Sequence, residues 1–299
     1  MRLSEWQRAL VLVCLCLSVL GQTSCLHRRR VVTQEIVPHA DPALASELLG
    51  LIAEQYRAVS DFKATVFLSV TLGKPNRRNV KRYPGIRGYI LLRKPADIRI
   101  MGLAPMMGSR IFDMVSNGDW FRLSVPSKNR FVVGRDEVRT LSRNKLENIR
   151  PRHLLEVIVP KPLDPATETA TVEGPDEGDG YTLHLVRSST IGNSRPSRTI
   201  WIDGATLHVA REVIFSDASA TLTEARYSQW RQTDGVIFPM RIEIDRPQEE
   251  YRLVIQIQAI EINRGLSNEM FVLEQPPGTQ RVVLSDPGAP PQHDDDHPR

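Results

Sequence analysis

The sequence lacks the features on which most enzymes and metal proteins depend. It has three cysteines in 299 residues, and the patterns Gly-x-Ser-x-Gly and His-Glu-x-x-His and a glycine-rich phosphate loop do not occur. Seven histidines are scattered along the chain without partners at ligand spacing. We therefore expect a protein that is not an enzyme, with no catalytic residue, no metal site and no cofactor.

The chain also lacks a strong excess of one charge and an apolar run that could span a membrane. Its net charge of +4 excludes an acidic disordered chain and gives little indication of an anionic partner. The apolar run at residues 9–20 has twelve residues, whereas a transmembrane helix needs about twenty. Because Arg2 and Arg8 precede it, this run is typical of an export signal.

Residues 22–25 (QTSC) follow the apolar run and resemble the lipobox of bacterial lipoproteins, although Gln22 stands where Leu, Val or Ile is usual. Cleavage after residue 24 would remove the two earlier cysteines and leave Cys25 as the first residue and single thiol. A lone thiol in an oxidising compartment favours modification, and no intramolecular disulfide can form. We predict a signal peptide at 1–24 and a lipidated Cys25 that anchors the chain. The alternative is a soluble periplasmic protein that is cut nearby.

Residues 25–40, which follow the cleavage point, have no periodicity and are predicted to be a linker. Its arginines at residues 28–30 are either a solvated tether or a contact to anionic headgroups. Asp41 and Pro42 then start a helix, because they suit the N-cap and the first helical position. An apolar stripe continues this helix to about Ser60.

Short apolar runs separated by turn residues fill most of the remaining chain and predict an antiparallel meander. Strands are expected at residues 62–72, 88–92, 98–103, 111–115, 120–125, 131–133, 166–172, 181–186, 198–202, 207–215, 220–232, 237–245 and 251–262. Helices are expected at residues 141–146 and 151–159. The pairs Asn117-Gly118, Asp203-Gly204 and Asp234-Gly235 predict tight hairpins.

Within residues 86–134, positions of both parities are often apolar, so both faces of this part of the sheet are expected to be covered or to enclose something apolar. We predict a mainly β fold with a few helices (α+β), in which a strongly curved antiparallel sheet forms an incomplete β-barrel capped by helices. Residues 41–275 are expected to form this single domain. Residues 276–299, rich in Pro and Asp, are expected to be a disordered tail, including its His-Asp cluster at 293–297.

Several short motifs, taken in their order, resemble the LolA/LolB lipoprotein-localisation family over roughly residues 44–278. They lie at residues 94–99 (KPADIR), 116–120 (SNGDW), 124–127 (SVPS), 199–203 (TIWID), 227–230 (YSQW) and 238–242 (FPMRI), followed by Asn263, Phe271 and Pro276. The resemblance implies a half-open β-barrel whose concave apolar face holds acyl chains. Such a cavity binds without chemistry, since buried hydrocarbon gains about 25 cal/mol per Å².

Ten residues are the candidates for a ligand-binding wall, with plain core packing as the alternative for each: Ile98, Ile100, Phe112, Met114, Trp120, Phe121, Leu123, Trp201, Ile242 and Ile244. The resemblance also implies a lid-closing role for Arg99, whose alternative is an exposed arginine on a strand face. The residues of a protruding apolar loop, or of a loop folded back onto the core, are Leu103, Pro105, Met106 and Met107.

Together these features predict an exported bacterial lipoprotein that binds acyl chains of lipoproteins or lipids as a monomer. Leu26 follows the cysteine where an Asp retains some lipoproteins in the inner membrane, which favours a lipid anchor in the outer membrane, facing the periplasm. A periplasmic carrier protein is a candidate partner. Nucleic acid is not, because the basic loop at residues 73–85 has little aromatic interleaving. The alternative is an envelope stress sensor or structural lipoprotein that binds a protein partner.

Overall fold

The computed structural model describes residues 42–73, 80–104, 108–136, 148–175, 180–188 and 194–284. All of them belong to one compact unit that spans Pro38–Arg299. The predicted signal peptide, Cys25 and linker lie outside the described residues, as do the expected helix at 141–146 and the chain after residue 284.

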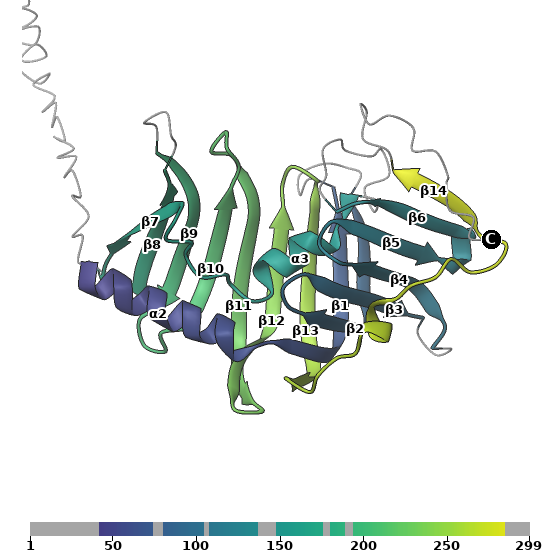
Figure 1. Ribbon diagram of the computed structural model, residues 1–299, viewed down its shortest axis with the longest axis horizontal. Coiled ribbons are helices and arrows are strands. Elements are labelled where there is room, and N and C mark those ends of the chain that lie inside the picture. The colour runs from purple at the N-terminus through teal and green to yellow at the C-terminus, as the bar shows by residue number, and fades with distance from the viewer. Residues whose placement is uncertain are drawn as a thin grey trace, which may run out of the picture. The chain divides into compact units, whose positions relative to one another are not determined.

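In the described residues the dominant element is one sheet of fourteen strands (Figure 1). Six of the strands precede the middle of the chain: β1 (Asp61–Leu72), β2 (Lys81–Arg93), β3 (Asp97–Leu103), β4 (Arg110–Ser116), β5 (Trp120–Val125) and β6 (Arg130–Arg135). The others are β7 (Glu168–Glu173), β8 (Gly180–Arg187), β9 (Arg195–Asp203), β10 (Val209–Phe215), β11 (Thr221–Thr233), β12 (Val236–Arg246), β13 (Tyr251–Ile262) and β14 (Gln280–Leu284).

The sheet consists of two meanders, the first of strands β1–β6 and the second of strands β7–β13, which meet where β1 pairs with β13. Its order is β14-β6-β5-β4-β3-β2-β1-β13-β12-β11-β10-β9-β8-β7, so nearly all neighbours are also neighbours in sequence. All pairings are antiparallel except that of β14 with β6. Because β14 and β7 stand at the two ends of the order, the sheet is open, as the predicted incomplete barrel requires.

Two α-helices pack against the sheet. The 17-residue α2 (Pro42–Ala58) buries the stripe that its sequence predicts, including Leu48 and Ile52, and contacts β7 and β12. The 7-residue α3 (Pro151–Val157) buries Leu154 and contacts β3 and β4. We call the face of the sheet that these helices cover the inner face. The buried side chains of both helices and of this face form one hydrophobic core. No helix among the described residues has the length and apolar character needed to cross a membrane.

Two of the three predicted tight hairpins differ from the prediction. At Asp234-Gly235 both residues have positive φ, 51° and 80°, as the prediction requires. Between β4 and β5, however, Gly118 has positive φ and Asn117 does not. The side-chain oxygen of Asn117 accepts hydrogen bonds from the amides of Asp119 and Trp120. After Asp203 the left-handed residue is Leu207, so the pair Asp203-Gly204 opens a longer turn.

The start of the predicted tail, from residue 276 to residue 284, is more ordered than predicted. Residues 263–279, which we call the C-terminal strap, include the 3-10 helix η3 (Asn268–Phe271) and lead into β14. The disordered tail expected from residue 276 is therefore wrong for residues 280–284, which pair in parallel with β6. Their strand was missed because five residues after a proline-rich stretch give little periodic signal.

The strap crosses the outer face of the first meander. Leu273 packs with Val115 and Phe131 in a second, small hydrophobic core that is separate from the main one. Arg93 donates to the Leu266 carbonyl at 2.8 Å and so holds the strap against β2. The prediction that residues 86–134 have both faces covered is thereby confirmed for this part of the sheet.

Candidate functional site

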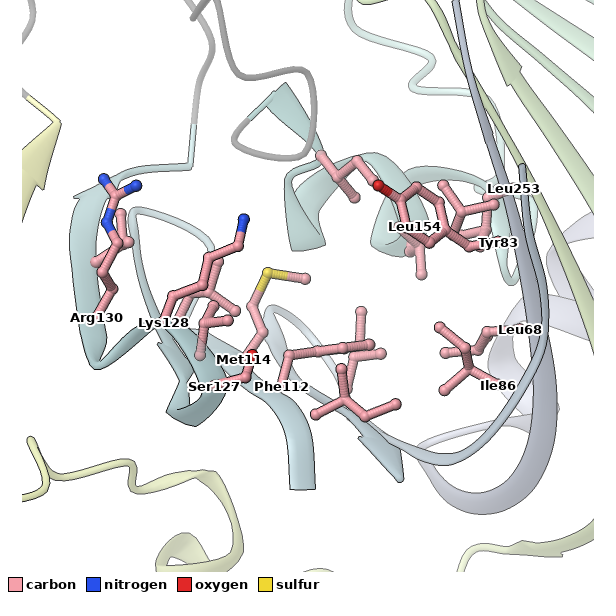
Figure 2. A pocket seen from close by; sticks show the side chains of 17 residues that line it. Leu68, Tyr83, Ile86, Phe112, Met114, Ser127, Lys128, Arg130, Leu154 and Leu253 are labelled. Carbon is pink, nitrogen blue, oxygen red and sulfur yellow. The ribbon is translucent and has the colours of Figure 1, made fainter. Parts of the chain in front are cut away.

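A largely apolar cavity of about 290 Å³ opens on the inner face of the first meander (Figure 2). It lies between strands β1–β6, the start of β13 and helix α3. Its lining residues are Leu68, Val70, Tyr83, Ile86, Ile100, Ile111, Phe112, Met114, Leu123, Val125, Ser127, Lys128, Arg130, Val132, Ile149, Leu154 and Leu253. Among the described residues no carboxylate lines this space, so it can hold hydrocarbon without desolvating an acidic group.

Strand alternation explains most of the wall. In β5, Leu123 and Val125 share the inner face, and in β3 Ile100 does the same. Gly102 follows Ile100 by two residues in β3. A Cβ at residue 102 would lie 2.3 Å from the ring of Phe112. The absence of a side chain at residue 102 therefore lets the Phe112 ring lie flat against β3 as part of the cavity wall.

Helix α3 forms the side of the cavity opposite the sheet, and polar contacts hold it at both ends. At its start, the Asp136 carboxylate accepts a hydrogen bond from the Arg152 amide at 3.3 Å and another from the Ser116 hydroxyl. At its end, the Tyr227 hydroxyl donates to the Val157 carbonyl at 2.7 Å. These contacts fix the position of α3 relative to the strands, and with it the position of Leu154 in the cavity wall.

The middle of α3 is held by a buried histidine. The Nδ1 of His153 lies 2.8 Å from the Tyr251 hydroxyl, and its Nε2 lies 3.0 Å from an Arg246 guanidinium nitrogen. Since the guanidinium can only donate, Nε2 accepts and Nδ1 carries the proton. Burial, followed by the positive charge of Arg246, lowers the pKa of His153 well below its usual value, so the imidazole is neutral.

Four of the ten predicted wall residues line the cavity: Ile100, Phe112, Met114 and Leu123. Four others are buried in the main core away from it: Ile98, Phe121, Ile242 and Ile244. The remaining two, Trp120 and Trp201, lie on the outer face. Their rings make cation–π contacts with the guanidinium groups of Arg135 and Arg211. Trp120 and Phe121 are adjacent in β5 and point to opposite faces, so a single cavity cannot use both.

Arg99 does not reach a lid over this cavity. It alternates with Ile98 and Ile100 and therefore points to the outer face, where it pairs with Asp113 at 2.7 Å. Its guanidinium also donates to the carbonyls of Met270 at 2.9 Å and Val272 at 3.3 Å, both in the C-terminal strap. The structure thus replaces the predicted lid-closing role with a strap-holding one.

The predicted apolar loop lies between β3 and β4. Leu103 is the last residue of β3, and the Ala104 amide donates to the Ser109 carbonyl at 2.8 Å, which closes the base of the loop. Pro105, Met106 and Met107 lie outside the described residues. Their predicted role in a protruding loop stays a prediction.

Thirteen lining residues were not among the candidates, for three different reasons. Val125 follows Leu123 at the spacing of one strand face, so alternation could have found it. Leu68 and Leu253 meet only because β1 pairs with β13, about 180 positions apart, and no local pattern announces that register. Ile111 faces inward because of the irregularity between Gly102 and Leu103 in the β3–β4 pairing.

Comparison with known proteins supplies a family model and several solved structures. A model with the description "-like: Uncharacterized protein" matches residues 164–275. The comparison with curated proteins gave no match.

No group of three or more His, Cys, Asp or Glu side chains in the described ranges is placed to hold a metal ion.

Three solved structures are each similar to this chain at 14% sequence identity. A DUF1329 family protein from Desulfovibrio piger matches with a TM-score of 0.48, covering 77% of this chain and 96% of its own. A LolA superfamily protein from Nitrosomonas europaea gives 0.47, with 75% and 97% covered. An outer membrane lipoprotein-sorting protein domain from Vibrio parahaemolyticus gives 0.46, with 76% and 94% covered.

Proposed function

We infer that this protein is a binding protein for acyl chains, and that the cavity under α3 is its binding site. The observation that carries this function is the unfilled apolar space of about 290 Å³ in the inner face of the first meander. A globular core of this composition normally packs without voids much larger than a water molecule. An apolar space of this size inside a domain is therefore a site for a guest.

The size of the cavity sets the size of the guest. At about 30 Å³ per water-sized group, it holds about ten methylene groups. At about 0.8 kcal/mol each, their burial contributes about 8 kcal/mol, part of which is offset by the lost freedom of the ligand. One chain with about ten buried carbons is enough to fill this space.

The wider biology follows from the sequence. The resemblance of residues 22–25 to a lipobox supports a lipid anchor on Cys25, and Leu26 supports the outer membrane, facing the periplasm. In this proposal α3 acts as the cap of the site, and the protein binds its ligand without transforming it. It receives or passes acyl chains of lipoproteins or lipids, with a periplasmic carrier protein as its partner.

Titration of the purified protein with dodecanol tests this function, because dodecanol offers a chain of suitable length without a charge. Isothermal calorimetry should show saturable binding with a negative heat-capacity change, the signature of apolar burial. Leu123→Trp should weaken binding because the indole occupies part of the cavity. The matched control, Ile237→Trp, changes an aliphatic side chain that is 44% exposed on β12 and should bind as the parent does.

Two outcomes would contradict the function. Equal binding by the parent and Leu123→Trp would place the hydrocarbon elsewhere. Failure of the parent to bind dodecanol, together with native mass spectra free of acyl species, would favour a protein partner, as in a stress sensor or structural lipoprotein.

A further inference from the structure

The charged atoms of the cavity wall are confined to one end. Lys128 and Arg130 are the charged residues among those that line the described cavity; Lys128 ends the turn after β5, and Arg130 is the first residue of β6. Figure 2 shows them at one end, beside Ser127 and Met114, whereas Leu68, Ile86 and Leu253 lie at the other. The wall therefore has the polarity of an amphiphile, with a long apolar part and one cationic end.

The backbone that carries Lys128 is held in place. Residues Pro126–Lys128 form the 3-10 turn η1, which ends at Asn129 in the left-handed conformation with φ of 50°. The Asn129 side chain donates to the Gly278 carbonyl at 3.2 Å, and its own carbonyl accepts from the Gln280 amide at 2.9 Å. The strap and β14 thus fix the backbone of this turn, from which the Lys128 side chain extends at the cavity end.

Lys128 is exposed and, among the described residues, has no carboxylate partner. An ammonium group at the end of an apolar space is complementary to an anion carried by the ligand that fills the space. Arg130 lines the same end of the cavity and has a partner of its own. Neutral and cationic headgroups would gain no ion pair with Lys128.

We propose that the ligand is a single-chain fatty acid, with its hydrocarbon against Ile100, Met114 and Leu123 and its carboxylate at Lys128, next to Arg130. A single chain is enough to fill the volume, and its carboxylate is complementary to the Lys128 ammonium group. This assignment rests on the proposed function, since it names the headgroup of the chain that the cavity holds.

Ligands with the same twelve-carbon chain and different headgroups separate the two ideas. In full-length protein at low salt, dodecanoate should bind about tenfold more tightly than dodecanol, and dodecyltrimethylammonium should bind most weakly. Lys128→Gln should reduce dodecanoate affinity by about three- to fivefold and leave dodecanol affinity unchanged. The matched control Lys63→Gln removes an exposed lysine from the outer face of β1 and should change neither.

Each other outcome has a distinct meaning. Equal affinity for dodecanoate and dodecanol, or an equal loss of both in Lys128→Gln, would overturn the headgroup assignment while leaving chain binding intact. Binding of monododecyl phosphate at least tenfold tighter than dodecanoate would overturn the carboxylate in favour of a phosphate headgroup. No binding of any member of the series would reject the proposed function itself.

Discussion

The two meanders of the sheet have the same alternation but different interiors. Strands β1–β6, the hollow half, leave a cavity against their inner face. Strands β7–β13, the filled half, bury Leu183, Leu185 and Ile200 in a continuous core together with α2. What differs is the element that covers each face. Helix α2 is about 26 Å long and spans the roughly 24 Å from β7 to β12, whereas the seven residues of α3 span about 10 Å.

A charged cluster completes the filled half. Arg198 pairs with Glu168 at 3.1 Å and with Glu212 at 3.4 Å, and it donates to the Lys161 and Pro162 carbonyls at 2.7 and 3.1 Å. Burial raises the pKa of Glu212 although Arg198 opposes it. The cavity thus lies against a face that a short helix covers only in part, whereas the other half is closed by a long helix and a buried charged cluster.

The largest expected effect comes from breaking this cluster. Arg198→Met should cost about 3–5 kcal/mol, because it leaves the Glu168 and Glu212 carboxylates buried without their cation. Urea unfolding followed by circular dichroism measures it. The control Arg252→Met breaks an exposed pair with Asp245 and should cost less than about 1 kcal/mol. Equal losses for the two variants would show that the cluster is not part of a packed interior.

Enlarging one residue in each half tests the comparison directly. Leu183→Phe in the filled half should cost about 1–3 kcal/mol by overpacking, since Leu183 is completely buried. Leu123→Phe in the hollow half should cost less than about 0.5 kcal/mol, because the ring enters empty space. The same variant should weaken dodecanol binding. A similar cost at both positions would mean that the cavity closes in solution.

Sequence reasoning recovered the elements better than the site. The stripe of α2 and the alternation of β13 predicted their buried faces, because each pattern lies within one element. The cavity depends instead on the β1–β13 register and on how far α3 reaches, and neither is a local property. Arg99 shows the intermediate case: its alternation with Ile98 and Ile100 already places it on the opposite face, but the strap that it holds lies some 170 positions away.

A smaller effect is expected from the buried His153 in α3, which should make the free energy of unfolding depend on pH. The pKa of His153 is lowered in the folded protein, whereas in the unfolded chain it is about 6.5. As pH falls below about 6.5, the unfolded state binds a proton that the folded state does not, so stability should fall by up to about 1.4 kcal/mol per pH unit. His153→Gln should flatten this slope in urea titrations at several pH values. His184→Gln, a more exposed histidine on β8, should retain it, and an unchanged slope in both would exclude His153 as its source.

The smallest effect is expected at Arg99, and it tests whether the strap and the cavity are independent of each other. Arg99→Lys should cost about 1 kcal/mol, since an ammonium group cannot keep the two-pronged pairing with Asp113 and reach the strap carbonyls as well. Hydrogen exchange at the amides of residues 270–273 should become faster, while dodecanol affinity stays that of the parent. Arg241→Lys, which alters a more exposed pair with Glu243 on β12, should leave exchange in the strap unchanged. A loss of dodecanol binding without faster exchange would return Arg99 to the lid role, because then its effect would reach the inner face without passing through the strap.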